Sequence, residues 1–276
     1  MSSTTLGYIK ENSMIHQLTG ATKMLCLVLY LLATMFTYDT RVLAILLIFS
    51  LICFKLSHIP FKNVSFVVYF ILVFLLINNI AIFIFSPLEG CNIYGRTTVL
   101  FHLFGPYKVT VEQLFYQLNI TLKYLAVIPI ALLFILATNP SEFAASLNRI
   151  GVSYRFSYSV AIALRYIPDV QRDYHEISFA QQARGMDLSK KEKLIKRIKN
   201  VSTILMPLIF TSLDRIETIA RAMELRSFGK NKKRTWYNAR PFTSKDFIAL
   251  LIVTIFLVFS LFMTYKNGGR FYNPFL

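Results

Sequence analysis

The chain has 276 residues, of which 55% are hydrophobic, 15% aromatic and only 16% charged. This composition argues against an ordinary soluble domain and indicates that much of the surface faces lipid. The net charge is +16, and 20 of the 30 Lys and Arg residues fall between positions 139 and 245. Retention of positive charge on the cytoplasmic side of a membrane explains most of this basic region. Nucleic-acid binding is disfavoured, because no recognition module or aromatic stacking platform accompanies the charge.

Five apolar segments predict an all-α polytopic membrane protein with about five transmembrane helices. In chain order they are residues 24–38, 42–54, 64–85, 120–137 and 247–265. Only three residues separate the first two segments, so we expect a tight helical hairpin there. Each helix of that hairpin is at the short end of what can cross a bilayer, whereas the third segment is long enough to cross alone.

The basic region sets the expected orientation, because Lys and Arg concentrate in cytoplasmic loops. With residues 139–245 in the cytoplasm, the N-terminus is also cytoplasmic, the loop 86–118 lies outside, and five spans place the C-terminus outside. The chain then divides into three parts. These are an N-terminal membrane domain of four spans (1–138), a cytoplasmic and interfacial domain of long amphipathic helices (139–245), and a last span with an outer tail (246–276).

The basic region begins with a predicted short helix. Ser141 is its expected N-cap, and the helix reaches Ile150. Gly151 is the expected C-terminal stop, because glycine suits the left-handed conformation that often ends a helix.

Two long amphipathic helices are predicted next. Apolar residues recur at steps of three and four in residues 163–177 and again in residues 209–223. Such stripes are typical of helices that pack on one another or lie at a membrane interface. Each helical run is expected to be interrupted upstream of its end by a proline, Pro168 in the first and Pro207 in the second.

An arginine stands at the end of each amphipathic stretch. The two motifs are Ala183-Arg184-Gly185 and Leu225-Arg226-Ser227. A single Arg before Gly is often only a helix C-terminal cap, favoured there by the helix macrodipole. Two copies favour a pair of docking elements instead, because an Arg fork forms charge-assisted, bidentate bonds with a partner's carboxylate. Met186 and Phe228 are placed to seat the arginines, and Glu224 is a third supporting residue.

These motifs and several others, in the same order, resemble a known family: the transmembrane T component of energy-coupling factor (ECF) transporters, which includes the cobalt-transport membrane subunit. The resemblance covers nearly the whole chain. The motifs that carry it are Thr138-Asn139-Pro140-Ser141-Glu142, Leu164-Arg165-Tyr166-Ile167-Pro168, residues 180–187, Met206-Pro207-Leu208 and residues 222–229. The resemblance implies a subunit of a multi-pass importer in the bacterial cell membrane.

The resemblance also implies the partners. In this family two crossed cytoplasmic coupling helices end in Ala-Arg-Gly-type motifs, and each arginine docks into a groove on one of two ABC ATPases. Arg184 and Arg226 would be those docking residues. Leu225 and Ser227 depart from the usual Ala and Gly, so we expect two ATPases that are not identical. A separate substrate-binding S component in the membrane, one of several that exchange, would capture a vitamin or a metal ion.

No catalytic or ATP-binding constellation is present in the sequence. The chain has no Gly-rich phosphate loop followed by Lys and Ser/Thr, no paired carboxylates within a span and no His cluster. We therefore expect a non-enzyme without a cofactor, with ATP and Mg bound by the partner ATPases. Two alternatives stay open. One is a polytopic membrane enzyme, which would need ionisable residues facing a cavity in the spans. The other is a scaffold that binds anionic lipid through the Lys-rich stretches 190–199 and 230–234.

Overall fold

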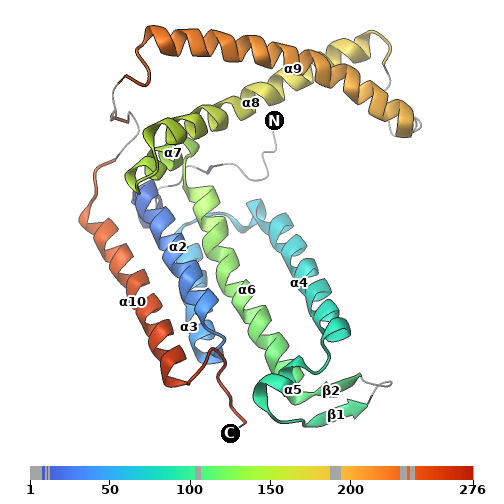
Figure 1. The fold of residues 1–276 in the computed structure, drawn as a ribbon, viewed down its shortest axis with the longest axis vertical. Coiled ribbons are helices and arrows are strands. Elements are labelled where there is room, and N and C mark those ends of the chain that lie inside the picture. The colour runs from blue at the N-terminus through green and yellow to red at the C-terminus, as the bar shows by residue number, and fades with distance from the viewer. Residues whose placement is uncertain are drawn as a thin grey trace. The chain divides into compact units, whose positions relative to one another are not determined.

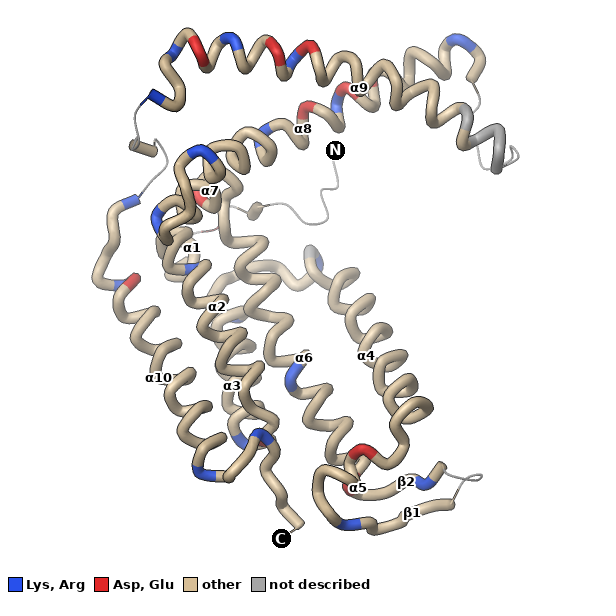
Figure 2. The backbone as a smooth tube through the Cα atoms, viewed as in Figure 1, with Lys and Arg blue, Asp and Glu red and all other residues tan. Residues whose placement is uncertain are grey.

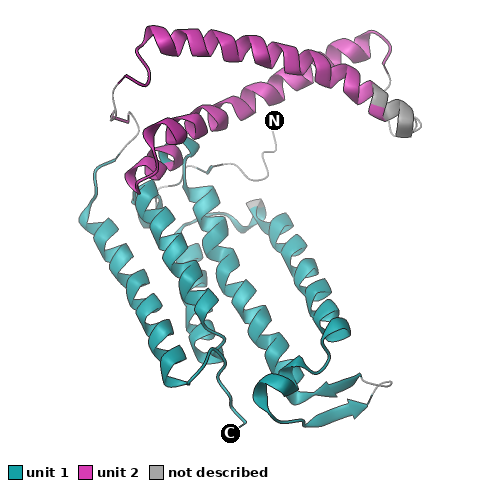
Figure 3. Cartoon of the chain, in the orientation of Figure 1, with its two compact units in different colours: residues 1–142, 240–276 teal, residues 143–239 magenta. Residues whose placement is uncertain are grey.

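The computed structural model describes residues 8–275 apart from 10, 12, 103–106, 187–193, 231–234 and 237–239. The chain forms two compact units, residues 1–142 with 240–276 (unit 1) and residues 143–239 (unit 2) (Figure 3). Helices make up nearly all of the regular structure in the described residues (Figure 1), which confirms the all-α class. The predicted division at residues 138 and 245 concerns the sides of the membrane and stays a prediction.

Unit 1 contains one helix for each of the five predicted apolar segments. These are α2 (Gly20–Phe36), α3 (Thr40–Leu56), α4 (Ser65–Phe85), α6 (Val111–Ala137) and α10 (Ser244–Lys266). Within the described part of the chain, α4, α6 and α10 are long and apolar enough to cross a membrane, which fits a multi-pass membrane protein. α2 and α3 have 17 residues each and are short for a span, as predicted.

A tight connection joins α2 to α3, and a buried tyrosine joins both to α6. Asp39 is fully buried and caps α3, where its carboxylate accepts the backbone N–H of Arg41 at 3.0 Å.

The core of unit 1 forms where α2, α3, α6 and α10 meet, around Tyr30, Leu46 and Val253. The Tyr30 hydroxyl lies 2.8 and 3.2 Å from backbone carbonyls of α3 and α6, so one side chain ties three helices together.

The loop between the third and fourth predicted spans is structured. Short elements complete unit 1, namely α1 (Met14–Gln17), the 3-10 helix η1 (Phe61–Asn63), α5 (Glu89–Tyr94) and an antiparallel hairpin of β1 (Val99–His102) and β2 (Lys108–Thr110). α5 and the hairpin lie in that loop. α6 starts at Val111, well before the predicted span at Ile120, and the Thr110 side chain caps its first turn.

The C-terminal tail lies at the same end of unit 1 as α5 and the hairpin (Figure 1). The Asn273 side chain donates to the carbonyl of Tyr94 at 3.2 Å, and the Tyr38 N–H donates to the carbonyl of Arg270 at 2.8 Å. This arrangement is compatible with one membrane side for the loop and the tail. Which side that is stays a prediction.

Buried polar side chains join the helix ends at the opposite end of unit 1. Asp246 is fully buried and accepts the backbone N–H groups of Thr19, which precedes α2, and of Thr243, both at 2.8 Å. Glu142 accepts the first N–H of α2 at 3.0 Å and lies 3.9 Å from the guanidinium of Arg240. Glu142 and Arg240 are also the points where the chain leaves and re-enters unit 1, so this network holds the two crossing points together.

Three helices form the described part of unit 2: α7 (Pro140–Arg149), which begins in unit 1, α8 (Tyr154–Ala183) and α9 (Leu194–Leu225). α8 and α9 pack against each other and carry acidic and basic residues along their lengths (Figure 2). The predicted N-cap of α7 is wrong, because the helix starts at Pro140 and the Asn139 side chain accepts the N–H of Ser141 at 3.0 Å. Gly151 is confirmed as the stop, with a φ of +104°.

Pro168 and Pro207 lie inside continuous helices, so the predicted interruption of each helical run is wrong. α8 has 30 residues and α9 has 32, and each passes through its proline. A proline removes one backbone hydrogen bond from a helix, and the many other bonds of a long helix tolerate that loss. Each apolar stretch is therefore carried without a break to the arginine at its end. Most of the Lys-rich stretches 190–199 and 230–234 lies outside the described residues.

Candidate functional site

The first arginine motif forms the C-terminal turn of α8. The helix ends at Ala183, and Gly185 adopts the left-handed conformation with a φ of +88°. The N–H of Met186 donates to the carbonyl of Gln181 at 3.2 Å, and the N–H of Gly185 donates to the next carbonyl along at 2.9 Å. These two bonds define a Schellman motif, which satisfies carbonyls that a helix end leaves free. Arg184 is the last residue before the left-handed turn, and it is exposed.

The second arginine motif forms the same turn at the end of α9. The N–H groups of Phe228 and Ser227 donate to carbonyls five and three residues earlier, both at 2.9 Å. Ser227 occupies the left-handed position, with a φ of +53°, where α8 has Gly185. Arg226 therefore has the same place in its turn as Arg184, and it is exposed as well. The two motifs share a backbone geometry in addition to an arginine.

An aromatic cluster, here named the tip cluster, includes Phe228, the residue that follows Ser227. It consists of Tyr154, Tyr158, Phe228 and Trp236, the single tryptophan of the chain. The centroid of the Phe228 ring lies 4.7 Å from that of Tyr158 and 5.7 Å from that of Tyr154. Each such ring pair contributes about 0.5–1.5 kcal/mol beyond burial. Phe228 therefore packs against the start of α8 within unit 2, and its role in seating Arg226 on a partner stays a prediction.

The other predicted site residues lie at the surface or close to it. Leu225 is 88% exposed, Glu224 and Ala183 are exposed, and Met186 is half-buried. An apolar side chain as exposed as Leu225, beside an exposed arginine, is suited to contact another molecule. The two tips thus present an arginine next to a small residue in α8 and next to a large apolar residue in α9.

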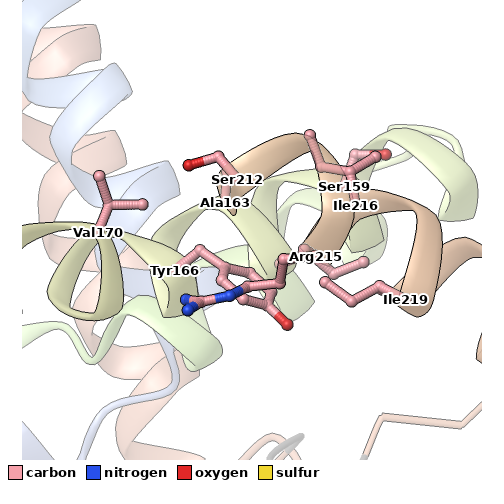
Figure 4. Close-up of a pocket in the computed structure, with 9 residues that line it drawn as sticks. Ser159, Ala163, Tyr166, Val170, Ser212, Arg215, Ile216 and Ile219 are labelled. Carbon is pink, nitrogen blue, oxygen red and sulfur yellow. The ribbon is translucent and has the colours of Figure 1, made fainter. Parts of the chain in front are cut away.

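An ion pair and a groove lie where α8 and α9 meet. The guanidinium of Arg215 on α9 is 2.8 Å from the carboxylate of Asp173 on α8. Beside it is a mostly apolar groove of about 330 Å³ (Figure 4), and the Arg215 guanidinium lies 5.9 Å from the centroid of the Tyr166 ring. The groove is lined by Ser159, Ile162, Ala163, Tyr166, Val170, Ser212, Arg215, Ile216 and Ile219.

The predicted apolar stripes are partly exposed even where they line this groove. Ala163 and Val170 from the first stripe and Ile216 from the second line the groove, and Ile216 is still 60% exposed. Ile167 and Leu213, which belong to the same stripes, are each 51% exposed. The two helices therefore leave apolar side chains uncovered within the chain, as expected for helices that also contact lipid or another protein.

The described residues contain no cluster of three His, Cys, Asp or Glu side chains that could hold a metal ion. His16 forms local hydrogen bonds with the hydroxyl of Ser13 at 2.8 Å and the carbonyl of Ile9 at 3.1 Å. Burial, together with the nearby charge of Lys23, lowers the pKa of His16. The two exposed helix tips with matching turns are the candidate site.

Comparison with known proteins agrees with the resemblance seen in the sequence. A family model for cobalt transport proteins (CbiQ) matches residues 11–237. The chain is 28% identical to the energy-coupling factor transporter transmembrane protein EcfT of Streptococcus equi, over 91% of this chain and 93% of that protein. It is 26% identical to the EcfT of Bacillus subtilis, over 94% of this chain and 98% of that protein. Since the family model covers well over half of its length, the chain belongs to the CbiQ family of cobalt transport proteins.

Proposed function

We propose that the chain is the energy-coupling transmembrane subunit of an ECF-type importer for vitamins or metal ions. Two ABC ATPase subunits, which bind the ATP and Mg, dock on the tips of α8 and α9. A separate S component binds the substrate in the membrane beside this chain, and several S components can share it. The printed names of the relatives support the proposal, because they are transmembrane proteins of energy-coupling factor transporters.

The observation that carries the proposal is the pair of matching helix tips. Two long helices end in the same Schellman turn, and each turn exposes an arginine at the same position. A guanidinium fork at a helix end suits a groove that contains a carboxylate, because the bond is charge-assisted and bidentate. Gly185 in one turn and Ser227 in the other, with Ala183 and Leu225 before the arginines, support two ATPases of related but different shape.

The dimensions of α8 and α9 suit the transmission of movement. A helix of 30 residues is about 45 Å long, so a shift at its tip is carried far from the ATPase. The Arg215–Asp173 ion pair links the two helices where they meet, so a movement of one helix is transmitted to the other. The exposed apolar side chains of α9, such as Phe210 and Leu213, are the surface we assign to the S component and the bilayer.

The test is to measure the affinity of the nucleotide-loaded ATPases for the reconstituted chain. We expect Arg184→Ala and Arg226→Ala each to weaken binding by roughly a hundredfold, because a carboxylate in the partner loses its counter-charge. Arg172→Ala and Arg221→Ala are matched controls: both arginines are exposed on the same helices, at 70% and 78%, and pair with their own helix. Unchanged ATPase binding and substrate uptake in the Arg184→Ala, Arg226→Ala double variant would overturn the proposal.

A further inference from the structure

The turn that carries Arg226 is built on an unfavourable residue. Ser227 has a φ of +53°, a region that L-residues with a side chain adopt at a cost in free energy. α7 and α8 end in the same type of turn and place Gly151 and Gly185 at the left-handed position. Of the described non-glycine residues, only His58 shares a positive φ with Ser227. Some other interaction must therefore hold the α9 turn.

The tip cluster supplies that interaction through the next residue in the chain. The N–H of Phe228 forms the Schellman bond that spans five residues, and the Phe228 ring packs on Tyr158 and Tyr154 at the start of α8. In a Schellman motif the residue at this position commonly makes an apolar contact that fixes the turn. Here the contact is with another helix, so the turn is held by the packing of α8 as well as by α9.

Two hydrogen bonds add to this attachment. The Arg155 side chain lies 3.4 Å from the carbonyl of Gly229, directly after Phe228. The indole N–H of Trp236 donates to the side-chain oxygen of Asn148 on α7 at 3.1 Å. Gly229 is thus bonded to the first turn of α8, and Trp236 is bonded to α7.

The tip of α8 differs in this respect. Gly185 carries no side chain, and a Cβ placed on it would meet no atom within 4 Å. The left-handed turn there follows from glycine itself, without crowding and without a need for outside support. The same turn is therefore stabilised by the glycine itself at the end of α8 and by the packing of Phe228 at the end of α9.

We propose that Phe228, packed against Tyr154 and Tyr158, is a positioning residue that keeps Ser227 left-handed and so orients Arg226 toward its partner subunit. The inference rests on the proposed docking role of Arg226, but its structural half concerns this chain alone. If it holds, the α9 tip depends on the tip cluster, and a glycine at position 227 removes that dependence.

The first test uses hydrogen exchange on the full chain in detergent, without any partner. Phe228→Ala is expected to speed exchange of the amides at 227 and 228 by about tenfold, because their bonds open more often. Adding Ser227→Gly to that variant is expected to restore protection. Met186→Ala, the matched change after Gly185, is expected to leave the α8 turn protected. Unchanged exchange in Phe228→Ala, or no recovery with Ser227→Gly, overturns the inference.

The second test measures ATPase binding with the same variants. Phe228→Ala is expected to weaken binding by about tenfold, and the Phe228→Ala, Ser227→Gly variant to regain most of it. In an Arg226→Ala background, Phe228→Ala is expected to have no further effect, because it acts through Arg226. A further loss in that background overturns the positioning role. If Arg226→Ala itself has no effect, the proposed docking fails while the exchange result still decides whether Phe228 holds the turn.

Discussion

Asp246 holds the start of α2 to the start of α10, and replacing it should lower the free energy of unfolding. The loss should grow with the number of hydrogen bonds that each substitution removes. One carboxylate oxygen accepts the Thr19 N–H within a buried environment, and the other accepts the N–H and hydroxyl of Thr243 at 2.8 and 2.7 Å. Asp246→Ala leaves the buried Thr19 donor unpaired, which costs about 2 kcal/mol. It also removes the Asp246 half of the capping box that Asp246 forms with the N-cap residue Thr243, which costs about 1 kcal/mol. The expected total is about 3 kcal/mol.

Asp246→Asn should cost less, because its single oxygen can keep the buried bond to Thr19. The amide nitrogen then faces the Thr243 N–H and cannot accept it, so only the residue-246 half of the capping box is lost, at about 1 kcal/mol. Ser244→Ala, at an exposed neighbour in the same turn, is the control and should change stability by less than about 0.5 kcal/mol.

The assay is thermal unfolding of the purified full chain in one detergent. Asp246→Ala should lower the midpoint by roughly 6–12 °C, and Asp246→Asn by roughly 2–4 °C. Two results would refute the reasoning. One is an Asp246→Ala variant whose unfolding midpoint equals that of the Ser244→Ala control. The other is an Asn variant as unstable as the Ala variant, which would mean that the charge, not the count of bonds, matters.

Three further substitutions test other contacts between helices, again by thermal unfolding. Tyr30→Phe should cost about 1 kcal/mol, because the hydroxyl loses the carbonyls of α3 and α6 while the ring volume stays; no change would contradict this. Arg215→Gln should cost at most about 1 kcal/mol, because Arg215 and Asp173 are partly exposed; a larger loss would mean a stronger link than we infer. Gly90→Ala should cost about 2 kcal/mol, because a Cβ there would lie 2.5 Å from a backbone oxygen of α6; Gly269→Ala, in open space, is its control and should be near neutral.

The sequence predicts the helices of unit 1 well because hydropathy reports burial in lipid directly. Its main error there is the first third of α6, which it assigns to a loop. That part is polar, yet Glu112, Gln113 and Asn119 are fully buried. Their side chains bond the loop and α5, including the N–H of Gly90 to Gln113 at 2.8 Å and the Tyr94 hydroxyl near Asn119 at 3.4 Å. Long-range partners of this kind are not visible in a hydropathy pattern.

The sequence locates both arginines at helix ends, because the apolar stripes lead to them. It does not predict the tip cluster, since Trp236 and Tyr154 are brought together only by the fold. A signal was present: Ser227 stands where glycine is expected, and a large aromatic residue follows it. The predicted interruptions at Pro168 and Pro207 are wrong for a simpler reason. A proline disfavours a helix locally, but the long helices on both sides outweigh that preference.

The most direct test of the docking claim is photo-crosslinking from positions 183 and 225, each next to an intact arginine. A photoreactive residue would replace the exposed Ala183 or Leu225 singly in the chain assembled in its native membrane, with position 221 on α9 as control. The account predicts adducts with ATPase subunits from both tips, to one subunit from 183 and to the other from 225, and few from 221. Adducts from both tips with lipid or with an S component, and none with an ATPase, would contradict it.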